Sequence, residues 1–324
     1  MSSSTNENRP GRRRIFAFTL PLIVLLPFAE LAPGKCVLSL QIASVTWRGR
    51  NGTGYDPYDP TPYSQTVNFT LNKRGDGCPF FITFSKNTPG NNQRLMSKGN
   101  ETLTYQIYDT TSLNNVLKDL PSASANEVIS GTFSSNGNAQ PLSFVIAMPA
   151  QQLRGPGTYT DSVRVSVYEG TLANPTFVES ILVQISALIP AIANLCVVST
   201  GGVFDPTATR PALVFGELAT GKSLGCDLRV RSNAGYTLSF RSENAGVLKN
   251  LDPAATDKVP YTMLVSGNPV AFAQNDPKGL ITNGETPKDP NGDRYPIQVI
   301  IGTADNVESG NYRDIITVTV RANN

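Results

Sequence analysis

Histidine is absent from the 324 residues, and tryptophan occurs only once. Imidazole is the usual general base of nucleophilic hydrolases and the usual nitrogen ligand of zinc. The absence therefore excludes Ser/His/Asp and Cys/His arrangements and the commonest zinc sites. Asp56 and Asp59 lie in an Asp-Pro-Tyr-Asp-Pro stretch typical of turns, and residues 289–293 lack the ligand series of a calcium loop. We expect no enzyme, no cofactor and no metal.

Charge is also scarce, at 16% of residues against a usual value of about 25%. The net charge of +2 depends on four arginines and two glutamates within the first 32 residues. Beyond them the charge is close to zero. A neutral chain has no general attraction for phosphate backbones, so we expect no nucleic-acid partner.

The beginning of the sequence is typical of an export signal. Three arginines, Arg12 to Arg14, precede an apolar run from Ile15 to Ala29, and small residues follow as far as Ala32. The run is too short to span a bilayer of about 30 Å comfortably, and Pro21 and Pro27 interrupt it. We expect residues 1–32 to be cleaved on export; a retained membrane anchor is the alternative.

An exported protein reaches an oxidising compartment, so the four cysteines are expected to form disulfides. Cys36 and Cys78 lie in the first half of the chain, and Cys196 and Cys226 lie in the second. Four cysteines permit three connectivities. Local pairing, with one disulfide in each half, is the simplest.

The remaining pattern is that of β-structure. Apolar and polar residues alternate over many short stretches separated by clusters rich in Gly, Pro, Asn and Asp. Examples are residues 79–84, 103–108, 142–148, 236–240 and 297–301. The length predicts two domains. We expect an all-β fold of two tandem antiparallel sandwiches, residues 33–190 and residues 191–324.

The two halves repeat one motif and then differ. Residues 157–167 match residues 310–320, each copy beginning Gly-x-Tyr-x-Asp. We interpret this Tyr and Asp as structural: the ring packs and its hydroxyl binds backbone, while the carboxylate satisfies loop N–H groups. After the first copy the chain enters another strand with an apolar stripe at alternate positions: Phe177, Ile181, Val183, Ile185, Ala187 and Ile189. After the second copy only residues 321–324 follow.

This difference predicts that the second domain lacks its last strand. An incomplete sandwich exposes a backbone edge and the apolar side chains beneath the missing strand. Five aliphatic side chains left without cover represent about 7 to 15 kcal/mol. We expect the exposed groove to include Ala212, Val214, Ile316, Val318 and Val320. Alternatively, the domain tolerates fewer strands, or residues 212–215 fill the edge.

These features resemble the spore coat protein U family, which includes subunits of archaic, Csu-type chaperone–usher pili. The resemblance is carried by Val214-Phe-Gly216 with Gly225-Cys226, by residues 235–240, by Arg94-Leu-Met96 leading into residues 103–109, and by both Gly-x-Tyr-x-Asp strands. It implies incomplete immunoglobulin-like domains that a periplasmic chaperone holds, an outer-membrane usher assembles, and a strand from the adjacent pilin completes.

A two-domain member of that family resembles a tip adhesin, in which the first domain binds a receptor and carries its own last strand. The few residues between Ala32 and Cys36 leave no long donor extension, as the resemblance implies for a tip subunit. We therefore expect a pilus tip adhesin, exported to the periplasm and then displayed at the cell surface, that attaches to an abiotic surface or a host receptor and supports biofilm formation.

Apolar residues in turn-rich stretches of the first domain are candidates for the attachment surface. They are Trp47, Tyr55, Tyr58, Val116, Leu117, Leu120, Met148 and Leu153. Ordinary packing within the domain is the alternative for each of them. For the whole chain, the alternative functions are a minor structural pilin or spore-coat component without a receptor, and a secreted carbohydrate-binding sandwich.

Overall fold

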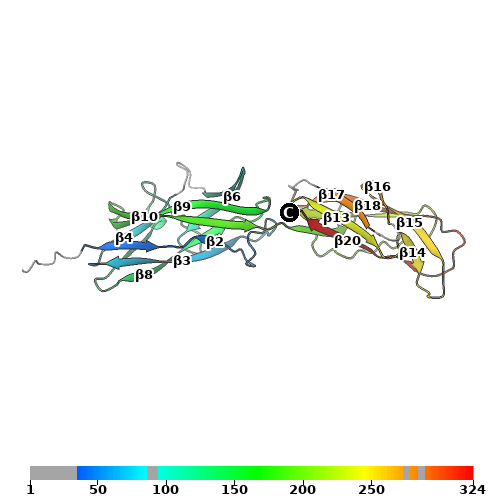
Figure 1. Ribbon diagram of the computed structural model, residues 1–324, viewed down its shortest axis with the longest axis horizontal. Helices are drawn as coiled ribbons and strands as arrows, with labels where there is room; N and C mark the ends of the chain where they lie inside the picture. Colours follow the sequence, from blue (N-terminus) through cyan, green and yellow to red (C-terminus); the bar gives the residue numbers. More distant parts are fainter. Residues whose placement is uncertain (1–34, 86–93, 273–277, 284–288, 324) are drawn as a thin grey trace, which may run out of the picture.

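A computed structural model describes residues 35–85, 94–272, 278–283 and 289–323 of the chain. It shows two β-domains that lie end to end and are joined near residue 190 (Figure 1). The expected export signal, residues 1–32, lies outside the described residues. In the part of the chain that is described, no helix has the length and apolarity that crossing a bilayer requires.

Among its described residues the first domain contains ten strands and one short 3-10 helix. The strands are β1 (Val37–Gln41), β2 (Val45–Trp47), β3 (Tyr63–Arg74), β4 (Pro79–Phe84), β5 (Arg94–Lys98), β6 (Glu101–Tyr108), β7 (Ile129–Thr132), β8 (Ala139–Met148), β9 (Gly157–Thr171) and β10 (Asn174–Ile189); the helix η1 spans Ala125–Glu127. Hydrogen bonding follows the order β1-β3-β8-β6-β5-β9-β10-β2, and β4 pairs with both β7 and β9.

The second domain contains the remaining ten strands. They are β11 (Ala193–Val198), β12 (Ser223–Ser232), β13 (Tyr236–Ser242), β14 (Val247–Asn250), β15 (Lys258–Val265), β16 (Asn268–Val270), β17 (Lys278–Asn283), β18 (Asp293–Ile301), β19 (Tyr312–Arg313) and β20 (Ile316–Ala322). One sheet has the order β11-β12-β18-β15-β14-β19, with β16 on β15, and the other has the order β17-β13-β20. The expectation of an all-β fold with two sandwich-like domains is confirmed.

Each domain has its own hydrophobic core, as the alternating sequence pattern predicts. In the first domain Phe84 of β4 packs edge-on against Phe144 of β8, with ring centroids 5.1 Å apart. In the second domain Leu238 and Phe240 of β13 are fully buried with strands β12, β15 and β18 around them. The two cores are separate clusters of buried residues.

The cysteines behave differently in the two domains. A disulfide joins Cys36 to Cys78, so the start of β1 is tied to the start of β4, as expected. The expectation of a second disulfide is wrong, because Cys196 and Cys226 are both free and buried. Cys196 lies opposite Arg229, three residues from Cys226 along β12. Side chains alternate along a strand, so the two thiols lie on opposite faces of the sheet. Burial raises the pKa of each thiol.

The apolar stripe expected along β10 is confirmed in its second half and wrong at its beginning. Val183, Ile185 and Ile189 are buried, with exposed fractions of 3% or less. A β-bulge between Phe177 and Glu179 shifts the alternation, because a bulge places an extra residue in one strand. Phe177 is therefore 58% exposed, and its neighbour Val178 packs against the core instead.

Candidate functional site

The repeated Gly-x-Tyr-x-Asp motif forms the same local structure in both domains. The hydroxyl of Tyr159 donates to the Gly155 carbonyl at 3.0 Å, and the hydroxyl of Tyr312 donates to the Glu308 carbonyl at 2.7 Å. Each tyrosine thus closes the loop four residues before it. The structural interpretation of this tyrosine is confirmed.

The aspartates of the motif are equally occupied. Asp161 accepts hydrogen bonds from the Tyr105 hydroxyl and the Ser162 amide, both at 2.7 Å. Asp314 accepts the equivalent bonds from the Tyr261 hydroxyl at 2.5 Å and the Ile315 amide at 2.8 Å. Burial, reinforced by the adjacent carboxylate, raises the pKa of Tyr105 and of Tyr261. Both phenols therefore remain hydrogen-bond donors at neutral pH, and each pair ties two strands of its domain together.

The strands that follow the motif have different neighbours. In the first domain β9 pairs with β4 on one edge and, over its whole length, with β10 on the other. In the second domain β20 pairs with β13, which is the counterpart of β4. Within the described residues no strand pairs with the other edge of β20. We call this outer edge of β20, with Ile316, Val318 and Val320, the acceptor edge.

The exposed fractions of matching side chains in β9 and β20 show the effect of a neighbouring strand, since β10 covers β9 and no described strand covers the outer edge of β20. Val163, Val165 and Val167 in β9 are 1%, 1% and 0% exposed. Their counterparts Ile316, Val318 and Val320 are only half-buried at the margin of the second core. The register of β10 explains the difference, because Val183 lies opposite Val163 and Ile181 opposite Val165. No described strand supplies the same cover at the acceptor edge.

The second domain also lacks a described strand equivalent to β2, which in the first domain lies beyond β10. In the first domain, β2 pairs with the outer edge of β10 in parallel. The corresponding segment of the second domain, residues 203–222, forms no strand. There the structure places Val214 outward, 79% exposed, with Ala212 also exposed, whereas Leu213 and Phe215 pack against the core. The expectation that Ala212 and Val214 line a groove is therefore wrong for these two side chains, because both point away from the core.

The candidates for the attachment surface are not exposed. Trp47, Tyr55, Tyr58, Leu117 and Met148 are buried, and Val116, Leu120 and Leu153 are half-buried. The prediction of an exposed adhesive set is therefore wrong for the five buried residues, which pack internally. For Val116, Leu120 and Leu153 a role in attachment stays a prediction. Tyr55 illustrates the reason: its hydroxyl donates to the Pro149 carbonyl at 2.7 Å and accepts from the Gln152 amide at 2.8 Å.

Tyr58 lies at the junction of the two domains. The guanidinium of Arg231 stands over the Tyr58 ring at 5.1 Å and over the Phe204 ring at 4.1 Å. Burial is the main cause that raises the pKa of Tyr58 to about 12. The linker is held beside it, because the Asn233 side chain accepts from the Ile192 amide at 2.7 Å and donates to the Pro190 carbonyl at 2.8 Å.

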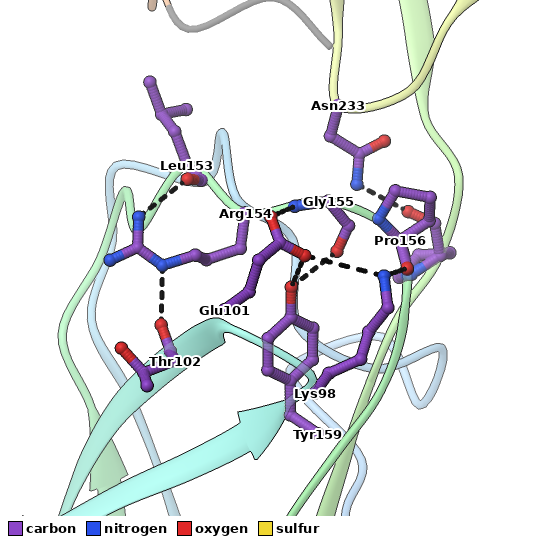
Figure 2. A network of polar contacts seen from close by, with 10 residues as sticks. Lys98, Glu101, Thr102, Leu153, Arg154, Gly155, Pro156, Tyr159 and Asn233 are labelled. Atoms are coloured by element: carbon purple, nitrogen blue, oxygen red, sulfur yellow. Dashed lines mark hydrogen bonds and ion pairs between the residues drawn. The ribbon is translucent and has the colours of Figure 1, made fainter.

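A polar network next to this junction fastens residues 154–156 to β5 and β6 (Figure 2). Arg154 donates to the Thr102 carbonyl at 2.5 Å, and Tyr159 donates to Glu101 at 2.8 Å. Burial pushes the pKa of Glu101 upward, but hydrogen bonds from Tyr159 and Gly155 and the charge of Lys98 outweigh it and leave the pKa below its ordinary value. Every one of these groups is engaged with a neighbour, so the network has a structural role.

Comparison with known proteins adds the following. The family model for the Spore Coat Protein U domain matches residues 50–166. A search of curated proteins found no match.

Three solved structures show similarity at low identity. The tip adhesion subunit CsuE, in complex with the chaperone CsuC of Acinetobacter baumannii, is 14% identical, covers 87% of this chain and 99% of its own, and has a TM-score of 0.45. The CupB6 tip adhesin of Pseudomonas aeruginosa is 11% identical, covers 87% of this chain and 94% of its own, and has a TM-score of 0.41. CfaE, the adhesive subunit of CFA/I fimbria of enterotoxigenic Escherichia coli, is 14% identical, covers 75% of this chain and 81% of its own, and has a TM-score of 0.34.

Proposed function

We propose that this chain, whose residues 50–166 belong to the Spore Coat Protein U domain family, is a tip adhesin of a chaperone–usher pilus. Residues 33–190 form the adhesin domain and residues 191–324 the pilin domain. The second domain takes a β-strand from another subunit on its acceptor edge, after a periplasmic chaperone has held it and an outer-membrane usher has received it.

The open edge of β20 carries this proposal. A strand edge with half-buried aliphatic side chains is a template for pairing with another chain, and proteins normally cover or charge such edges. Strand addition satisfies both needs at once, since main-chain bonds complete the ladder and alternate side chains fill the gaps in the core. The twin motif in the first domain shows the completed state, in which the same positions are fully buried.

Strand β10 indicates what an incoming strand must look like. Val183 and Ile181 of β10 lie opposite Val163 and Val165, whose counterparts at the acceptor edge are Ile316 and Val318. An antiparallel donor with aliphatic side chains at alternate positions would therefore meet Val318 and then Ile316. Each buried aliphatic side chain contributes about 1.5 to 3 kcal/mol.

The part of the first domain that the structure describes offers no such position beside β9. Strand β10 occupies the outer edge of β9 along its whole length, and β2 covers part of the outer edge of β10. A subunit with one closed and one accepting domain suits the end of a filament, where one neighbour only is needed.

Attachment is placed at the end of the first domain remote from the second. Strand β10 has 16 residues and so runs about 50 Å from Asn174 to the linker (Figure 1). Near its remote end Phe177 is 58% exposed and packs edge-on against Tyr168, with centroids 5.7 Å apart. Tyr168 stacks in turn on Phe81 at 4.8 Å. Phe177 and the half-buried Tyr168, supported from beneath by buried Phe81, replace the buried candidates as the proposed contact with an abiotic surface or a host receptor.

The test adds a synthetic peptide copying residues 178–189 to the full mature chain and follows amide hydrogen exchange. The peptide should slow exchange across residues 316–322 and raise the melting temperature of the second domain. A matched peptide with aspartate at the positions of Ile181 and Val183 is the control. Slow exchange at residues 316–322 without any peptide, and no response to it, would contradict strand acceptance.

Two further measurements separate the alternative functions. A minor pilin without a receptor would bind the peptide and assemble into pili, yet Phe177→Ser would not change attachment. A secreted carbohydrate-binding sandwich would be stable without a donor strand and would not depend on co-expression with a pilus chaperone.

A further inference from the structure

A hollow lies at the base of the first domain, beside the linker to the second. Buried Trp47, Tyr55 and Met148 line it, and Pro190 and Ile192 of the linker form one side. It contains about 550 Å³ of space between its atoms, including the part open to solvent. The hollow is independent of the acceptor edge and of the function proposed for it.

The rim of the hollow is polar and has unused hydrogen-bonding groups. Arg50, Asn51, Thr53, Asp56 and Thr61 line it, and all five are exposed. The side chains of Asn51, Thr53 and Thr61 form no hydrogen bond with the described residues. One oxygen of Asp56 accepts from the Tyr58 amide at 2.8 Å, and the other has no partner among the described residues. Amide, hydroxyl and carboxylate groups together offer both donors and acceptors.

The walls add aromatic surface and an unsatisfied donor. Trp47 packs edge-on against Tyr63, with ring centroids 5.3 Å apart. The indole N–H of Trp47 is buried and has no acceptor among the described residues. A buried donor without a partner carries the full cost of losing its contact with water. An acceptor that enters the hollow and displaces the cover of this N–H would recover part of that cost.

The loop that forms the rim is held in shape before any ligand arrives. Gly49 has φ of 63°, and a Cβ there would lie 1.9 Å from the Gly54 carbonyl oxygen. Gly54 has φ of 112°, and a Cβ there would lie 2.2 Å from the Leu188 carbonyl oxygen. The amide of Tyr55 donates to that same Leu188 oxygen at 2.8 Å. The rim is thus fastened to β10, which lowers the entropy lost on binding.

We infer that this hollow binds a neutral saccharide, with a pyranose ring against the aromatic wall and its hydroxyls on the polar rim. An anion is disfavoured because Asp56 and Asp59 outnumber Arg50. A quaternary ammonium ion suits aromatic rings and carboxylates but offers no acceptor to the Trp47 N–H and leaves Asn51 unused. A sugar hydroxyl both donates and accepts, so it matches all the groups present.

Trp47 is the only tryptophan of the chain, so its fluorescence reports on the hollow directly. The experiment titrates the full mature chain with methyl glucoside, methyl galactoside and methyl mannoside separately, up to about 10 mM, a concentration that saturates a site with a dissociation constant of about 1 mM. At least one sugar should change the emission saturably. The double variant Asn51→Ala/Thr53→Ala should weaken that response at least tenfold with an unchanged melting temperature, whereas Thr176→Ala, at the remote end of β10, should leave it unaltered.

Three outcomes would overturn the inference: no saturable response to any of the three sugars, binding that the rim variant does not weaken, or a response to tetramethylammonium in place of sugars. Saturation-transfer NMR on Trp47→Phe provides a second readout. This variant keeps an aromatic ring but removes the N–H, and the saturation transferred from the protein to the sugar should fall. None of these results depends on strand acceptance, so the two proposals fail separately.

Discussion

Truncating one valine in each twin strand should have unequal effects on stability. Val165 in β9 is 1% exposed, and Val318, its counterpart in β20, is half-buried at the acceptor edge. Replacing valine by alanine removes about two methylene equivalents, at about 0.8 kcal/mol each. A residual cavity adds about 24 cal/mol per Å³ where the surroundings are closed. Val165→Ala should therefore cost about 2 to 3 kcal/mol of unfolding free energy, and Val318→Ala less than about 1 kcal/mol.

A bound donor strand should make the stability losses of Val165→Ala and Val318→Ala nearly equal. With a peptide copying residues 178–189 bound beside β20, Val318 becomes as enclosed as Val165, and the cost of Val318→Ala should rise to about 2 kcal/mol. Urea unfolding of the full chain provides both values. Fluorescence of Trp47 follows the first domain, and hydrogen exchange in β13 and β20 follows the second.

The reasoning would be refuted if Val318→Ala cost as much as Val165→Ala in the absence of peptide, because β20 would then already be covered. It would also be refuted if the peptide left the cost of Val318→Ala unchanged. The cost of Val165→Ala is the internal control, since β10 covers it permanently and no added peptide should alter it.

Two further predictions concern the two domains separately. Cys36→Ser should lower the unfolding free energy of the first domain by up to about 4 kcal/mol, because the disulfide closes a loop of 42 residues; a Trp47 urea midpoint equal in oxidised wild type and variant would disprove this. In the second domain, burial pushes the pKa of Asp227 upward, but the Arg294 guanidinium at 2.7 Å and the Gly201 amide at 2.6 Å outweigh burial and hold the pKa below its ordinary value of 3.8. A depressed folded-state pKa stabilises the domain above the ordinary pKa, and this stabilisation is lost as pH falls through the folded-state value. The urea concentration at the unfolding midpoint of the second domain should therefore decrease as the pH is lowered below about 4. Arg294→Gln should make the midpoint depend less on pH. An unchanged pH dependence in the variant would exclude Asp227 as its origin.

The correspondence between β9 and β20 is predictable from the amino-acid sequence alone, and so is the difference that a further strand follows only β9. Period-two alternation marks a strand, and repetition of Gly-x-Tyr-x-Asp marks the same strand twice, so the positions of Val163 and Ile316 can be matched by their distance from the motif. Local pairing in an oxidising compartment predicted one disulfide in each half, and of the two only Cys36–Cys78 forms. These features depend on local pattern, which a sequence carries directly.

Several sequence-based predictions were wrong about the face of the sheet, or the side of the segment, to which a side chain points. A shift of one residue moves every side chain of a strand to the other face. The bulge at Phe177, the outward position of Val214 and the opposed faces of Cys196 and Cys226 are all of this kind. No local pattern fixes such a shift, because the register depends on the partner strand.

A different error affected the turn-rich stretch that includes Trp47 and Tyr55. Its glycines and prolines predict turns, but composition does not show whether a turn lies over the domain or projects into solvent. Hydrogen bonds from Tyr55 to Leu188 and to Pro149, which is 94 residues away in sequence, decide that this one folds inward. Only contacts between distant residues could have identified it.

The path of the chain between the domains has a mechanical consequence. Strand β10 leads through residues 190–192 into β11, and each strand lies in an antiparallel ladder, with β9 on one side of the junction and with β12 on the other. Antiparallel hydrogen bonds lie perpendicular to their strands. A pull that separates the domains along the chain therefore loads these bonds in shear, all together, and does not unzip them one after another. Tension should first break the bonds of Asn233 to Ile192 and Pro190, so the joint yields before either domain does.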